Sequence, residues 1–199
     1  MHKEEWSNLH GGAEVKGVIK IWLDIAEKFS KLLLRFKISP NFLTLLSLFA
    51  SIPLLSHPNY WWLALLSLLL DGLDGSLAIL SNRVSKFGAL LDSVADRCVE
   101  FLWAIALFNL GANFFLLSTF IGSAWLCEYI RARSGGIGFQ KIGVVTVSER
   151  PVRSIFIIIL LAASSIGIEK FFTIILIFAT ALQVIALYQI VKSIKKLIN

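Results

Sequence analysis

Charged side chains are scarce in this sequence. Only 16% of the 199 residues are charged, whereas 57% are hydrophobic, and the mean hydropathy is +0.78. A soluble domain carries about 25% charged residues. The shortage of charge excludes an ordinary soluble enzyme and predicts an all-α integral membrane protein with several spans.

The sequence also lacks a basic, aromatic-rich soluble module that could bind nucleic acid. Its formal net charge is +6, but in a membrane protein such a balance reflects cytoplasmic loops and anionic lipid headgroups. We therefore expect membrane lipids as partners, and no nucleic acid.

Cysteine is nearly absent, which excludes a cysteine metal site. Cys98 and Cys127 lie in apolar stretches without metal-ligand spacing, so both are predicted to be small buried hydrophobes. The N-terminal residues MHKEEWSNLHGG lack an apolar core, so no cleaved signal peptide is expected. No internal repeat or linker divides the chain, and residues 1–199 are predicted to form a single membrane domain.

An amphipathic helix is predicted at residues 14–36. Apolar residues recur there at helical spacing: Val15, Val18, Ile19, Trp22, Ile25, Ala26 and Phe29. Six charged residues occupy the other face, which is typical of a helix lying in the membrane interface. An ordinary surface helix is the alternative. Pro40 ends this helix, and Ser39 or Asn41 caps the next.

Six transmembrane spans are predicted after the interfacial helix. They lie near residues 41–57, 60–81, 87–110, 112–131, 151–167 and 170–191. Basic residues concentrate on the side that holds the N-terminal helix, the 131–150 loop and the C-terminus. By the positive-inside rule, both termini and the polar clusters described next face the cytoplasm of a cell membrane.

Four aspartates lie within or at the edge of the apolar spans. Asp71 and Asp74 are three residues apart, and Asp92 and Asp96 are four apart, so each pair shares a helix face. The connection between the two helices is short, which makes them antiparallel neighbours. At about 1.5 Å of rise per residue, the two pairs meet at similar depth.

Four carboxylates at one depth repel one another, and a hard divalent cation relieves that repulsion. Two ions, Mg²⁺ or Mn²⁺, are expected, because two-metal sites suit phosphoryl transfer. In the alternative reading, these are interfacial aspartates that pair with Arg83, Lys86 and Arg97. Intramembrane acids are rare and usually functional, which favours the metal site.

Small residues accompany the acids: Gly72, Gly75, Ala78 and Gly88. They allow close helix packing, and they also leave room for a flat ligand. The sequence leaves both readings open.

These residues resemble the motif of the CDP-alcohol phosphotransferase family, D-x-x-D-G-x-x-A-R followed by G-x-x-x-D-x-x-x-D. The first half stands here as DGLDGSLAI (71–79) and the second as GALLDSVAD (88–96). ISPNFLT (38–44) is similar to a further family feature. Ile79 departs from the motif, because the family usually has arginine at that position.

The resemblance implies an enzyme that joins a lipid phosphate from a CDP-linked lipid (CDP-diacylglycerol or CDP-archaeol) to an alcohol, with release of CMP. Asp71, Asp74 and Asp92 would be the main metal ligands; Asp96 would complete the site and act as general base. Gly75, Ala78 and Gly88 would make room for the cytidine diphosphate. Arg83, one turn after Ile79, is a candidate replacement for the arginine, although it also fits a plain cytoplasmic charge. A homodimer is likewise implied.

A second polar cluster is predicted to bind the phosphate of an anionic acceptor. It comprises Arg133, Lys141, Arg150 and Arg153, and arginine forks bind phosphate bidentately. Ordinary cytoplasmic loop charge is the alternative. YIRARS and ERPVR resemble family members that use inositol phosphate, and also some phosphatidylglycerolphosphate synthases. Inositol 3-phosphate is therefore the first expectation, glycerol 3-phosphate the second, and serine or free inositol rank lower.

Two functions of other classes remain open. Intramembrane aspartates also carry ions in transporters, although the inverted repeats and broken helices of many transporters are lacking here. Ile79 also allows a non-catalytic relative that serves as a partner subunit.

Overall fold

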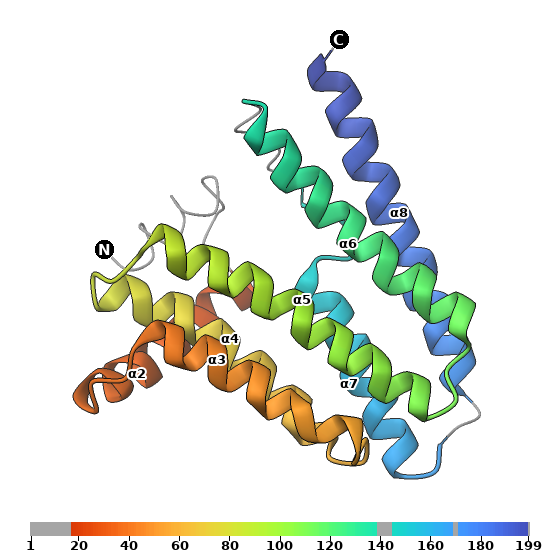
Figure 1. The fold of residues 1–199 in the computed structure, drawn as a ribbon, viewed down its shortest axis with the longest axis horizontal. Coiled ribbons are helices and arrows are strands. Elements are labelled where there is room, and N and C mark those ends of the chain that lie inside the picture. The colour runs from red at the N-terminus through yellow and green to blue at the C-terminus, as the bar shows by residue number, and fades with distance from the viewer. Residues whose placement is uncertain (1–16, 139–144, 169–170, 199) are drawn as a thin grey trace. The chain divides into compact units, whose positions relative to one another are not determined.

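Helices are the only regular secondary structure in the residues that the computed structural model describes, which are 17–138, 145–168 and 171–198 (Figure 1). The helices in chain order are α2 (Gly17–Arg35), α3 (Pro40–Ser51), the short 3-10 helix η1 (Ile52–Leu55), α4 (Trp61–Leu80), α5 (Lys86–Asn109), α6 (Phe114–Gly136), α7 (Arg150–Ser165) and α8 (Phe172–Ile198).

Six of these helices coincide with the six predicted spans. Helix α8 differs most, because it continues to Ile198, seven residues beyond its predicted span. Helix α6 continues to Gly136 and so carries Arg133 on the helix itself. Two helices, Trp61–Leu80 and Phe172–Lys196, are long and apolar enough to cross a membrane alone. The bent pair Lys20–Arg35 and Pro40–Leu55 would make a third if it acts as one span. The count of six spans remains a prediction, since α7 has only 16 residues.

The chain forms two compact units. The first comprises residues up to Ser51 together with Leu65–Val99, and the second comprises Ile52–Ala64 and the residues from Glu100 onward. Helices α4 and α5 contribute to both units. The four aspartates of the motif all belong to the first unit, and Arg133, Arg150 and Arg153 of the basic cluster belong to the second.

In the first unit, α2 and α3 form an elbow with a bend of 107°. Lys37 adopts a left-handed conformation with φ of 56°, and the Ile38 backbone N–H donates to the carbonyl of Leu33. Proline begins α3, and the Ser39 hydroxyl accepts a hydrogen bond from the Phe42 N–H at 3.2 Å. The predicted break at Pro40 and the cap by Ser39 are confirmed.

The apolar residues of α2 divide into two stripes, whereas the sequence predicted a single apolar face. One stripe is buried and contains Leu23 and Ala26, with the buried polar residue Ser30 on the same face. The other is exposed and contains Ile21, Ile25, Phe29 and Leu32, and the exposed Phe36 directly follows the helix. Packing against the rest of the unit covers the first stripe only. The exposed stripe fits a membrane interface, which remains a prediction for this helix.

The second unit packs α6 against α8, with α7 also contacting α8 (Figure 1). Its buried apolar residues include Trp103, Phe120, Ile157 and Leu176. Cys127 is buried there, as predicted. Cys98, in the first unit, is exposed, so its prediction as a buried hydrophobe was wrong. It is one residue, or about 100° around the helix, from the buried Val99.

Candidate active site

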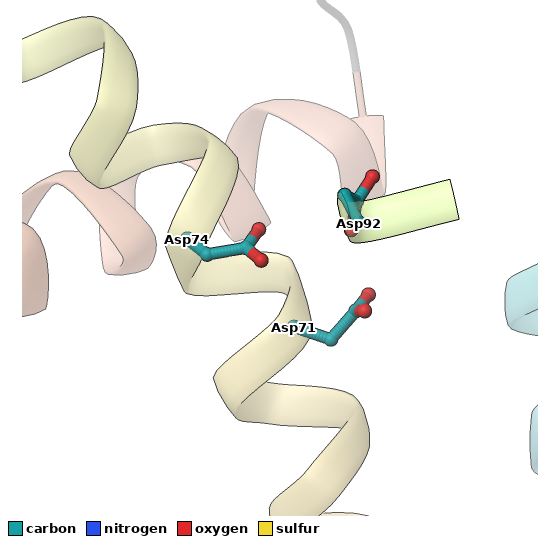
Figure 2. A group of neighbouring side chains, drawn as sticks. All are labelled: Asp71, Asp74 and Asp92. Atoms are coloured by element: carbon teal, nitrogen blue, oxygen red, sulfur yellow. The ribbon is translucent and has the colours of Figure 1, made fainter. Parts of the chain in front are cut away.

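Three aspartates converge in the first unit. Asp71 and Asp74 project from α4 and Asp92 projects from α5 (Figure 2). One carboxylate oxygen from each lies within 4.8 Å of those of the other two. Asp74 is buried, with 6% of its surface exposed, and the other two are partly exposed. The prediction that the two helices bring their acids to one depth is confirmed for these three residues.

The turn between α4 and α5 produces this register. The Arg83 N–H bonds to the Ala78 carbonyl at 2.9 Å and closes the end of α4, with Asn82 in a left-handed conformation. Ser85 then caps α5, because its hydroxyl accepts from the Gly88 N–H at 2.9 Å. A tight reversal with both ends capped sets Asp92 opposite Asp71 and Asp74.

Asp96 lies one helical turn beyond Asp92 on α5. Its Oδ2 atom is 3.7 Å from Nη2 of Arg97, and the described carboxylate group contains Asp71, Asp74 and Asp92. The structure thus brings together three of the four predicted metal ligands. The roles of Asp96 as fourth ligand and general base remain predictions.

Thr44 is a polar partner of this site that the sequence reasoning missed. Its hydroxyl is buried on α3 and donates a short hydrogen bond to Oδ2 of Asp74. Such a bond orients the carboxylate, as outer-shell partners of metal ligands do. A signal was present, because Thr44 ends the ISPNFLT stretch, but nothing local linked that residue to Asp74.

The residues present fit a divalent cation. All three converging groups offer carboxylate oxygen, the ligand that Mg²⁺ and Mn²⁺ prefer. Their mutual approach within 4.8 Å allows one ion to contact several of them. The Thr44 hydroxyl donates a hydrogen bond to Asp74, so one of the three candidate ligands is also held in place by a second residue.

The small residues turn out to have different surroundings. A Cβ at Gly72 would lie 2.6 Å from Cζ2 of Trp22, and one at Gly88 would lie 3.0 Å from Oγ of Ser85. At Gly75 nothing lies within 4 Å of such an atom. Close packing therefore accounts for Gly72 and Gly88, while Gly75 opens onto space beside Asp74.

The remaining predicted CDP-binding residues, Ala78 and Arg83, lie at the end of α4 and just after it. Ala78 is partly buried and Arg83 is exposed. Ile79, which replaces the motif arginine, is 5% exposed. It is part of the apolar core, so this chain places a packing residue where the motif carries a charge.

The second unit holds its arginines against acids. Arg153 is 1% exposed, and its Nε donates to Oε1 of Glu100 at 2.7 Å. Its Nη2 lies 3.3 Å from Oε1 of Glu128. Arg131 makes a bidentate pair with Glu149, at 2.6 and 3.0 Å. The sequence reasoning placed Glu149 in the second polar cluster but missed Glu100 and Glu128, although Glu100 within an apolar span was a visible signal.

Glu149 also organises the segment before α7. Its Oε1 accepts from the Thr146 N–H at 2.6 Å and from the Thr146 hydroxyl at 2.8 Å. Burial by itself raises the pKa of Glu149, but the hydrogen bonds from Arg131 and Thr146 outweigh burial and lower the pKa below its usual 4.5. Glu149 is therefore an ionised anchor for Arg131.

The other predicted acceptor-binding residues have varied surroundings. Arg133 is exposed and Arg150 is half-buried at the first position of α7. Lys141 lies outside the described residues. Arg153, one of the four residues predicted to bind the acceptor phosphate, has its guanidinium against the carboxylates of Glu100 and Glu128.

Long apolar helices and a carboxylate cluster on a DxxDG…D framework together define a helical membrane enzyme that uses a divalent metal. The family model for CDP-alcohol phosphatidyltransferase matches residues 37–191. The chain belongs to the CDP-alcohol phosphatidyltransferase family.

Curated relatives include two archaetidylinositol phosphate synthases. That of Aeropyrum pernix is 32% identical over 151 residues, which cover 73% of this chain and 77% of the relative. That of Pyrococcus horikoshii is 35% identical over 153 residues, which cover 71% and 80%.

The fold matches the crystal structure of Mycobacterium tuberculosis phosphatidylinositol phosphate synthase with CDP-DAG bound. The TM-score is 0.71 at 22% identity, covering 85% of this chain and 92% of that one. The same protein in complex with manganese and citrate matches with a TM-score of 0.70. The predicted all-α fold and family membership are confirmed.

Proposed function

We propose that this membrane enzyme transfers a phosphatidyl or archaetidyl group from a CDP-linked lipid to inositol 3-phosphate and releases CMP. The observation that carries this proposal is the convergence of Asp71, Asp74 and Asp92 within 4.8 Å on the family motif. The names of the two archaeal relatives support inositol phosphate as the acceptor.

Four aspartates have roles in the proposed reaction. Asp71, Asp74, Asp92 and Asp96 hold two divalent ions, Mg²⁺ or Mn²⁺, and the hydroxyl of Thr44 fixes the Asp74 carboxylate. Bound ions would neutralise charge on the pyrophosphate and on the leaving CMP. Asp96 accepts the proton of the acceptor hydroxyl. The hydroxyl oxygen then bonds to the lipid phosphorus as the bond to the CMP oxygen breaks.

The cytidine diphosphate would lie along the end of α4. The open space at Gly75 supports this placement, because a Cβ there would meet no atom within 4 Å. Ala78 and Gly88 complete the proposed surface, and exposed Arg83 supplies positive charge to the diphosphate.

The acceptor phosphate would be bound by Arg133, Lys141, Arg150 and Arg153. Arg133 is exposed, whereas Arg153 is buried against Glu100 and Glu128. We therefore expect Arg133→Ala to raise the KM for the acceptor with little loss of stability. Arg153→Ala should instead reduce the amount of folded protein, because it removes the partner of a buried carboxylate.

The enzyme would lie in the cell membrane as a homodimer, with both termini and the active site on the cytoplasmic side. The basic residues that gather on one side of the predicted spans support this orientation. The exposed apolar residues of α2 support a position of this helix in the membrane interface on the cytoplasmic side.

The test is to purify the protein and measure CMP release with CDP-diacylglycerol or CDP-archaeol in the presence of Mg²⁺ or Mn²⁺. The acceptors are inositol 3-phosphate, glycerol 3-phosphate, serine and free inositol. We expect metal-dependent CMP release, highest with inositol 3-phosphate and lost in Asp92→Asn. Higher turnover with glycerol 3-phosphate would overturn the acceptor, and equal CMP release by wild type and Asp92→Asn would overturn the metal site.

A further inference from the structure

An aromatic side chain of α2 lies directly on the backbone of the aspartate-bearing turn of α4. A Cβ built at Gly72 would lie 2.6 Å from Cζ2, 3.3 Å from Cε2 and 3.5 Å from Cη2 of Trp22. Real Cβ atoms do not approach carbon this closely, so only glycine fits beneath the ring. Gly72 directly follows Asp71 and precedes Asp74 by two residues.

The contact is rigid on the α2 side. Leu23, Ala26 and Ser30 are almost fully buried and anchor the helix within the first unit. The indole side chain also has only two rotatable bonds, so it cannot bend away from Gly72 as a lysine or methionine side chain could. Any added atom at position 72 therefore pushes α4 and α2 apart.

The second arm of the elbow touches the same turn of α4. On α3, Thr44 donates its hydrogen bond to Asp74, two residues along α4 from Gly72, on which Trp22 packs. Because a bend of 107° joins α2 to α3, the elbow contacts this turn at a packed ring and at a hydrogen bond. Two contacts from two directions restrict both the position and the rotation of the helix that presents Asp71 and Asp74.

We propose that Trp22 is a positioning residue, which sets the placement of Asp71 and Asp74 for metal binding by packing on Gly72. The inference rests on the metal-binding role proposed for these aspartates. Trp22 touches neither substrate nor metal in this account; it acts through the backbone at Gly72. Ligand geometry for Mg²⁺ and Mn²⁺ tolerates little displacement, so a small shift of α4 weakens binding.

The test is a double-mutant cycle on the full-length protein in lipid nanodiscs: wild type, Gly72→Ala, Trp22→Leu and the double variant. Mn²⁺ affinity is measured by electron paramagnetic resonance of the free ion, and metal-free thermal unfolding reports folding. Matched controls are Gly122→Ala, a helical glycine with open space around a Cβ, and Trp62→Leu, an exposed tryptophan on α4.

Gly72→Ala should weaken Mn²⁺ binding by about tenfold, the effect typical of groups that orient metal ligands. Trp22→Leu alone should weaken it by roughly threefold, less than the loss of a full orienting contact. In the double variant the smaller side chain makes room for the methyl group, so affinity should return to that of Trp22→Leu. The two controls should bind Mn²⁺ as wild type does.

Wild-type affinity in Trp22→Leu overturns the proposal, even where Gly72→Ala does not yield folded protein. A double variant as weak as Gly72→Ala also overturns it, because the ring would not be the obstacle. Asp92→Asn distinguishes failure of the proposed metal site from failure of the proposed role of Trp22. If this variant too binds Mn²⁺ as wild type does, the proposed metal site is wrong. If Asp92→Asn loses Mn²⁺ while Trp22→Leu does not, only the role of Trp22 fails.

Discussion

The acidic residues of the two units have opposite kinds of neighbour. In the first unit, the carboxylates of Asp71, Asp74 and Asp92 face one another. In the second, Glu100, Glu128 and Glu149 face the guanidinium groups of Arg131 and Arg153. Converging acids favour an added cation, whereas acids enclosed by arginines are already neutralised and hold structure. Acidity alone therefore does not identify a metal site in this protein; the nearest neighbours of each carboxylate do.

The largest effect is expected from removing a carboxylate that faces an arginine in the second unit. Glu100→Gln leaves the buried Arg153 without its closest anion, and should lower the free energy of unfolding by about 3–5 kcal/mol. Thermal unfolding in detergent measures the loss. The exposed pair of Glu27 and Lys31 provides the control, because Glu27→Gln should cost less than about 1 kcal/mol. Similar losses in both variants would contradict a structural role for Arg153.

Replacing an acid of the first unit should have the opposite effect on stability. Asp92→Asn removes repulsion among the three carboxylates, so the metal-free protein should unfold at a higher temperature than wild type. Mn²⁺ affinity and CMP release should fall by at least about 100-fold, more than the loss of an outer-shell partner. A lower metal-free Tm would show that these acids, too, serve mainly as structure.

Thr44 sharpens the comparison, because it is the buried hydroxyl that holds Asp74. Thr44→Val keeps the shape of the side chain but removes the donor, and should weaken Mn²⁺ binding by about tenfold. Thr44→Ser retains the hydroxyl and should stay near wild type. Isothermal titration with Mn²⁺ distinguishes the two; equal affinities for Val and Ser would remove Thr44 from the site.

The smallest effect concerns pH and Glu149. Because the pKa of Glu149 is lowered in the folded protein, its ionised form contributes stability that is fully present above pH 4.5 and is lost as pH falls through the folded value. Glu149→Gln should therefore be less stable than wild type by about 1 kcal/mol at neutral pH, with the gap closing in acid. Tm measured from pH 7 to pH 3 tests this, and a gap that widens in acid would contradict it.

Much of the active site was predictable because it depends on spacing along helices. Asp71 and Asp74 share a face of one helix, Asp92 lies on the next, and a short turn joins them. The rise per residue then places all three at one depth. Helix α4 was predicted at residues 60–81 and found at Trp61–Leu80, because a long apolar run between turn residues has one stable local structure.

Faces and partners were less predictable. Spacing placed Ala26 and Phe29 together on α2, yet the first is buried and the second exposed. Which part of an apolar arc is covered depends on what packs there, and such a neighbour can be far away in sequence, as Gly72 is from Trp22. Asp96 is a second example. It is four residues after Asp92 and so shares its helix face, yet the group of converging carboxylates contains Asp71, Asp74 and Asp92.

The sequence by itself determined a helical membrane protein, its family and the pair of helices that bear the acids, because these follow from hydropathy, periodicity and a local motif. Only the tertiary structure decided that Thr44 bonds to Asp74, that Trp22 covers Gly72 and that Arg153 is enclosed by Glu100 and Glu128. Each of these contacts joins residues at least 25 positions apart. Their free energy depends on distances of a few ångströms between side chains, which helical periodicity does not specify.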